Sequence, residues 1–130
     1  MKVLLLTPFD GTGVPRPLTE ALTKAGVVAE TWPGSDFRNF ASFLKMMDRF
    51  RPDLVIFNDP FGEDKNLEYP TLVARYEAEL WMVIDEFRDR SSDQEAEWDD
   101  LWGDAELFLP KKFFTPEVVT ALVLSKQSSN

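Results

Sequence analysis

The run KVLLLT, residues 2–7, constrains the fold of this chain more than any other feature of its sequence. Its inner residues, 3–6, are all apolar, so none of them favours contact with water. Pro8 and Gly11 follow the run closely. A strand with one solvated face alternates polar and apolar residues, so this run is expected to be buried on both faces. It therefore predicts a strand inside a sheet that carries helices on both sides.

Further strands and helices alternate along the rest of the chain. Strands are expected at VVAETW (27–32), PDLVIFND (52–59), LWMVI (80–84) and AELFL (105–109). Helices are expected to begin near Pro15, Ser35, Pro70, Ser92 and Thr115. This alternation predicts an α/β fold, a doubly wound parallel sheet of five strands. Residues 1–125 are expected to form one domain, followed by a frayed tail at residues 126–130.

Composition excludes several kinds of chemistry, because the 130 residues include no cysteine and no histidine. Disulfides and thiolate metal sites are thereby excluded, together with the commonest general base near neutral pH. The net charge of −9 argues against binding to nucleic acid or anionic membranes, which requires clustered Lys and Arg. No apolar run approaches the roughly 20 residues of a spanning helix. We therefore expect a cytoplasmic protein that needs no cofactor.

In a doubly wound sheet, ligands bind in the crevice beyond the carboxyl ends of the strands. The residues expected at this edge are Thr7, Pro8, Asn58, Asp59, Asp85 and Lys111. Lys111 either pairs with Asp85 across the edge or stays solvated in its loop, since surface ion pairs are common and weak.

The segment GDAELFLPKKFFTPEVVTALV, residues 103–123, resembles the end signature of the receiver domains of two-component response regulators. That signature has a glycine turn, an aromatic residue, an invariant lysine followed by proline and phenylalanine, and a helix that begins with Pro-Glu. RPDLVIFND, residues 51–59, resembles the segment that delivers the phosphoacceptor aspartate, and residues 1–7 and 18–37 resemble the opening of the family. The resemblance covers essentially the whole chain and implies the (βα)5 flavodoxin-like fold.

Carried over residue by residue, the resemblance implies a receiver pocket that lacks the residues for Mg²⁺ binding and phosphoryl transfer. Receivers hold Mg²⁺ with two acids after the first strand, where this chain has Thr7 and Pro8. Asn58 stands at the phosphoacceptor position, and Asp85 stands where a hydroxyl normally meets the phosphoryl group. Lys111 matches the family lysine. We therefore expect no catalytic residue and no metal in this pocket.

Two further positions follow from the same resemblance. Phe108 matches the switch aromatic of receivers, although ordinary core burial is an alternative reading. Lys112 replaces the proline that usually follows a cis peptide bond in the family. A cis bond before a residue other than proline costs about 2.5–4 kcal/mol, so a trans bond is expected before Lys112.

The acid-rich segment 85–106 contains Trp98 and Trp102 at a spacing that places both on one helix face. They belong either to the core or to an interface, where charge-ringed tryptophans are frequent anchors. In receivers the face from the fourth to the fifth helix binds dimer partners and effectors. A protein partner or a homodimer through this face is therefore expected.

These observations favour an atypical receiver-like signalling module, without enzymatic activity, that acts by protein–protein interaction and is not phosphorylated on aspartate. Two alternatives stay open. One is a phosphorylatable receiver that uses Asp59 with a divalent metal held by Asp10 or Asp85. The other is a nucleotide-sugar-binding Rossmann-like domain, since residues 1–27 also resemble the opening of nucleotide-sugar glycosyltransferases.

Overall fold

The computed structural model describes residues 1–7, 15–33, 40–58, 73, 75–84 and 106–128. Its strands are β1 Lys2–Thr7, β2 Val28–Pro33, β3 Leu54–Asn58, β4 Glu79–Ile84 and β5 Leu107–Pro110. Its helices are α1 Pro15–Lys24, α2 Phe40–Phe50, the 3₁₀ helix Lys111–Phe113 and α5 Pro116–Ser128. Within these ranges, no helix is both long enough and apolar enough to cross a bilayer.

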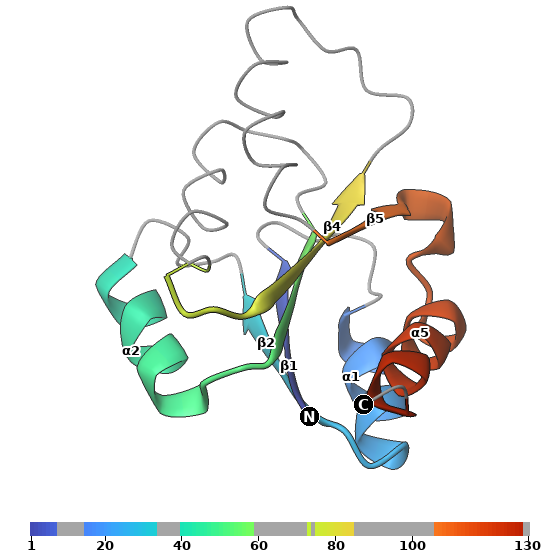
Figure 1. Cartoon of the computed structure of the whole chain (residues 1–130), viewed down its shortest axis with the longest axis horizontal. Coiled ribbons are helices and arrows are strands. Elements are labelled where there is room, and N and C mark those ends of the chain that lie inside the picture. Colours follow the sequence, from blue (N-terminus) through green and yellow to red (C-terminus); the bar gives the residue numbers. More distant parts are fainter. Residues whose placement is uncertain (8–14, 34–39, 59–72, 74, 85–105, 129–130) are drawn as a thin grey trace, which may run out of the picture.

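The five strands form one sheet in the order β2-β1-β3-β4-β5, and every neighbouring pair is parallel. Helices α1 and α5 lie on one side of the sheet and α2 lies on the other (Figure 1). The chain thus winds outward from β1 in two directions, which is the doubly wound arrangement. The predicted fold class is confirmed.

The core consists of two apolar clusters, one on each side of the sheet. Alternate strand residues such as Leu5 and Ile56 pack with α1 and α5, whereas Leu4 and Phe57 pack with α2. All five residues of β3 are buried. The apolar run at residues 3–6 is also fully buried, so the prediction of a strand without a solvated face is confirmed.

The end of α1 is set by Gly26. Gly26 has a φ of 87°, and the Val27 N–H donates to the Leu22 carbonyl at 2.9 Å. This is the hydrogen bond of a Schellman cap, which needs a left-handed residue where glycine avoids a Cβ penalty. Leu22 and Val27 are both buried in the same cluster, so the cap is also packed against the core.

Helix α5 begins as predicted, because the Thr115 Oγ1 accepts the Val118 N–H at 3.3 Å and so caps the first turn. The helix continues to Ser128, so residues 126–128, which the sequence placed in a frayed tail, are helical. An ion pair between Lys126 and Glu79 of β4 holds this last part of α5 against the sheet.

Other predictions fall on residues that the structure does not describe. Ser35 lies in 34–39, and α2 is described from Phe40 onward. The helices predicted to begin near Pro70 and Ser92 lie outside the described residues, apart from Val73, which is helical and buried. The peptide bonds of the described residues are trans, including the bond before Lys112.

Candidate functional site

The carboxyl ends of four strands meet at one edge of the sheet, as the sequence predicted. Leu6 of β1 lies beside Phe57 of β3, and Asn58 lies beside Val83 of β4. Ile84 then pairs with Pro110 of β5, which Lys111 follows directly. The register therefore brings the ends of β1, β3, β4 and β5 together.

We call the six residues predicted at this edge the rim: Thr7, Pro8, Asn58, Asp59, Asp85 and Lys111. The structure describes only some of them. Thr7 ends β1, Asn58 ends β3, and Lys111 begins the 3₁₀ helix after β5. The other predicted positions, Pro8, Asp59, Asp85, Trp98 and Trp102, lie outside the described residues. The Lys111–Asp85 ion pair and the tryptophan face therefore remain predictions.

Among the residues that the structure describes, Asn58 is the only polar one that is buried, with 1% of its surface exposed. Strand alternation puts it on the same face as Leu54 and Ile56, toward α1 and α5. A carboxamide carries no charge, and its nitrogen lone pair is delocalised into the carbonyl. Asn58 can therefore donate and accept hydrogen bonds here, but it offers neither a nucleophile nor an anionic metal ligand.

Lys111 is held by a tight turn at the end of β5. The Phe114 N–H donates to the Lys111 carbonyl at 3.0 Å, and the Phe114 side chain is buried in the cluster beneath α5. The neighbouring Lys112 ammonium lies over the Phe113 ring, 5.2 Å from its centroid. The two lysines therefore differ in setting, because Lys111 is half-buried and Lys112 is exposed beside an exposed ring.

Phe108, the predicted switch aromatic, belongs to β5 and pairs in register with Met82. Its side chain lies outside what the structure describes. The role of Phe108 as a switch aromatic therefore stays a prediction.

Several solved structures share this arrangement of strands and helices. A CheY-like response regulator receiver domain protein from Methanospirillum hungatei JF-1 superposes with a TM-score of 0.67 at 14% identity, covering 99% of this chain and 95% of that one. A response regulator receiver protein from Burkholderia phymatum gives 0.63 at 20% identity, covering 94% and 92%. The chain has the receiver fold.

Other proteins with this fold carry other names. A protein named for pilus assembly from Burkholderia thailandensis E264 matches over 100% of both chains, with a TM-score of 0.63 at 15% identity. The sequence itself matches no protein-family model and no curated protein. At identities this low the likeness concerns the receiver fold alone, and function must be argued from the site.

The receiver fold implies a Mg²⁺ site at this rim, and the rim residues that the structure describes supply no carboxylate for it. Mg²⁺ requires near-octahedral oxygen ligands, usually including one or two carboxylates. Thr7 and Asn58, the rim residues of β1 and β3, are both neutral. Among the described residues, no group of three His, Cys, Asp or Glu side chains is placed to hold a metal ion.

Sequence reasoning missed a charged cluster at the opposite edge of the sheet. Glu79 begins β4, accepts a hydrogen bond from the Trp81 indole Nε1 at 2.8 Å, and pairs with Lys126 of α5. Glu106, just before β5, lies next to it in the sheet, since its N–H donates to the Leu80 carbonyl at 2.9 Å. The spacing of Glu79 and Trp81 was a usable signal, since residues two apart in a strand share a face.

The two carboxyl groups of this cluster have pKa values displaced in opposite directions. Burial acts to raise the pKa of Glu79, but hydrogen bonds from Glu106, Lys126 and Trp81 outweigh it and lower that pKa. The hydrogen bond to Glu79 raises the pKa of Glu106, and burial and the Glu79 charge add to the effect. Glu79 is therefore the ionised partner, and Glu106 keeps its proton longer.

Proposed function

We propose that this chain is an atypical receiver-like signalling module that acts through contact with another protein, without phosphorylation on aspartate. The observation that carries the proposal is Asn58, buried at the carboxyl end of β3, where receivers have their phosphoacceptor aspartate. The receiver fold supports a signalling role, and the residue at this one position argues against phosphoryl transfer.

Phosphoryl transfer to a side chain needs a nucleophile aligned with the phosphorus and positive charge around the transferred oxygens. In this chain Asn58 supplies no nucleophilic oxygen, and Thr7 supplies no charge to hold a metal. Lys111 is the family's cationic group that remains at the rim. Among the rim residues that the structure describes, there is thus a positive charge at Lys111, but neither the acceptor nor a carboxylate that would hold the metal.

The test is to incubate the protein with acetyl phosphate and Mg²⁺ and to measure its intact mass. The expected result is an unmodified wild-type mass. A matched variant that combines Thr7→Asp, Pro8→Asp and Asn58→Asp restores the family's acids and is expected to gain a phosphoryl group, which shows that the assay works on this scaffold.

A phosphoryl adduct on the wild-type protein would overturn the proposal. The variant Asp59→Ala then identifies the acceptor, because it removes the adduct if Asp59 is the nucleophile and leaves it unchanged otherwise.

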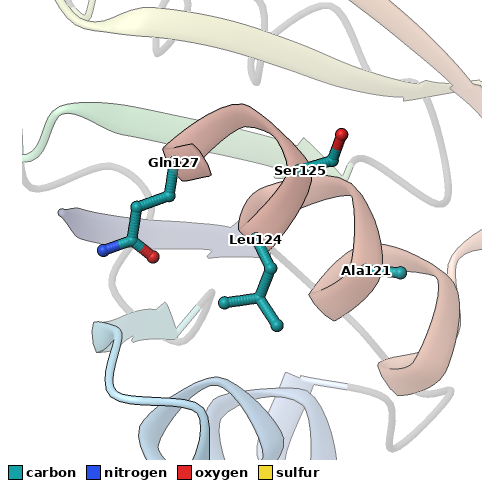
Figure 2. A pocket seen from close by; sticks show the side chains of 4 residues that line it. All are labelled: Ala121, Leu124, Ser125 and Gln127. Carbon is teal, nitrogen blue, oxygen red and sulfur yellow. The ribbon is translucent and has the colours of Figure 1, made fainter. Parts of the chain in front are cut away.

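The contact surface that we propose is the face from the fourth predicted helix, with Trp98 and Trp102, to α5. The Phe113 side chain, in the turn between β5 and α5, supports it, since this side chain is apolar and 45% exposed. Leu124 of α5, which is 38% exposed, lies on the α1 side instead, because Ala21 of α1 lines a hollow with it; Ala121, Ser125 and Gln127 line the adjoining surface (Figure 2).

A homodimer is the simplest form of this contact, and sedimentation velocity over a range of concentrations tests it. Phe113→Asp is expected to weaken self-association, because a charge within an apolar contact must be desolvated. Val28→Asp is the matched control, since Val28 is 55% exposed but lies on β2, the opposite edge strand. A monomer at every concentration, or equal effects of both variants, contradicts a homodimer through this face.

A further inference from the structure

A hollow lies between helices α1 and α5, which pack side by side on one face of the sheet (Figure 1). The buried residues Leu22 and Val119 of these helices belong to the same core cluster. The hollow has a volume of about 320 Å³, and its lining residues are Ala21, Pro116, Glu117, Thr120, Ala121 and Leu124. Apart from Glu117 and Thr120 this lining is apolar, so the hollow suits an apolar side chain.

A large and a small residue lie next to each other at the border of this hollow. Leu124 is an exposed apolar side chain, and Ala121, almost one turn before it on the same face of α5, is exposed and carries only a methyl group. At 1.5 Å per residue the two positions are about 4.5 Å apart along the helix axis. A second α5 that runs antiparallel to the first can therefore place its Leu124 over Ala121, and its own Ala121 under the first Leu124.

The charges on this side of the molecule favour a second copy of the chain as the occupant. The exposed charged residues of the two helices are Arg16, Glu20 and Lys24 of α1 and Glu117 of α5. The remaining charged residue of α5, Lys126, pairs with Glu79 of the sheet. Two positive and two negative side chains make this face neutral, in a chain whose net charge is −9. Copies with that net charge repel each other, and repulsion is least where neutral faces meet.

We propose that the α1–α5 face binds a second copy of this chain about a two-fold axis, with Leu124 of each copy in the hollow of the other. The two helices run in the same direction, from the carboxyl edge of the sheet back to its amino edge. In the antiparallel arrangement, Glu117 near the start of α5 therefore lies toward Lys24 at the end of α1 in the other copy. Every contact occurs twice, as a two-fold axis requires.

Sedimentation velocity over a range of concentrations measures this contact. Leu124→Asp is expected to weaken dimerisation at least about tenfold, because each dimer contains the change twice and each new charge must be desolvated. Leu124 is exposed in the single copy, so the variant is expected to stay folded, which circular dichroism checks. Val28→Asp, at an exposed apolar position on the edge strand β2, is the matched control and is expected to dimerise like the wild type.

Phe113→Asp distinguishes this contact from a homodimer through the other face, because Phe113 lies in the turn before α5. Self-association that survives Phe113→Asp and is lost in Leu124→Asp supports the α1–α5 face and leaves the other face free for a different protein. A wild-type monomer at every concentration, or association that is lost in Phe113→Asp and kept in Leu124→Asp, overturns it. These outcomes are independent of phosphorylation, which the acetyl phosphate assay measures separately.

Two charge-reversed variants test the antiparallel arrangement. Glu117→Lys places a cation near Lys24 of the other copy, and Lys24→Glu places an acid near its Glu117. Each variant alone is expected to dimerise about fivefold more weakly, the effect of two solvent-exposed charge pairs. In an equal mixture of the two variants, each reversed residue meets an opposite charge, so association at the wild-type level is expected. A mixture that associates as weakly as the separate variants overturns the proposed arrangement.

Discussion

Replacing Asn58 by aspartate tests whether the rim can accommodate a buried negative charge without loss of stability. The side chain at this position is 1% exposed, and its register partner Val83 and its strand neighbour Phe57 are also buried. A carboxyl group buried in such surroundings has a raised pKa, because desolvation disfavours its charged form. In the wild type the neutral amide avoids this cost.

The magnitude follows from the burial. A rise of about two pKa units above the ordinary aspartate value corresponds to a loss of about 3 kcal/mol in the free energy of unfolding at neutral pH. Because the pKa is raised, the loss is absent at a pH below the ordinary aspartate value, where the new carboxyl is protonated and resembles the amide, and it grows as the pH rises. Lys111 and any added Mg²⁺ are the charges that could reduce it.

Urea unfolding followed by circular dichroism, at acidic and at neutral pH, measures this loss. We expect Asn58→Asp to be nearly as stable as the wild type at acidic pH and clearly less stable at neutral pH, with no recovery when Mg²⁺ is added. Asn58→Leu is the control for the lost hydrogen bonds, because its destabilisation is expected to be independent of pH. If Asn58→Asp is as stable as the wild type at neutral pH, the rim already compensates an anion, and the reasoning is refuted.

Three further predictions concern the scaffold. Phe43→Ala is expected to lower the free energy of unfolding by about 3–5 kcal/mol in urea titrations, because Phe43 is fully buried and packs edge-on against Trp32. The control Phe113→Ala, at an exposed position, is expected to stay within about 0.5 kcal/mol of the wild type. Thr115→Ala is expected to cost about 1 kcal/mol in thermal unfolding through loss of the α5 cap, and Thr115→Ser to keep most of it; equal losses contradict the cap. Gly26→Ala is expected to cost about 1 kcal/mol through backbone strain alone, since an added Cβ meets no atom within 4 Å, and an unchanged melting temperature contradicts this.

The sheet could be predicted because its strands are apolar in the pattern that burial demands, but the ends of the edge strands were displaced by one or two residues. Val27 looks like a strand residue, yet its N–H completes the cap of α1, so β2 starts at Val28. The predicted strands 27–32 and 105–109 each stop one residue before a proline, although Pro33 and Pro110 still belong to β2 and β5. Both strands are at the edges of the sheet, where the missing N–H of proline is tolerated.

The two edges of the sheet differed in how far the sequence could predict them. The order of the elements alone brings Asn58 and Lys111 to the carboxyl edge, because all the strands are parallel. The cluster at the other edge depends on how α5 docks, since Lys126 is 47 residues from Glu79 in the sequence and its partner cannot be read from local spacing. Similarly, Val118, Val119, Leu122 and Val123 of α5 recur at helical spacing in the sequence, but only Val119 and Val123 are fully buried.

The central claim is that the carboxyl edge of the sheet can neither hold Mg²⁺ nor accept a phosphoryl group. The most direct measurement is the side-chain amide resonance of Asn58 in the ¹⁵N-labelled protein while Mg²⁺ and acetyl phosphate are added together. This amide is buried between the ends of β1 and β4, so a cation or a phosphoryl group bound at the rim must change its surroundings. The account predicts an unchanged resonance at millimolar Mg²⁺, and a saturable shift would contradict it.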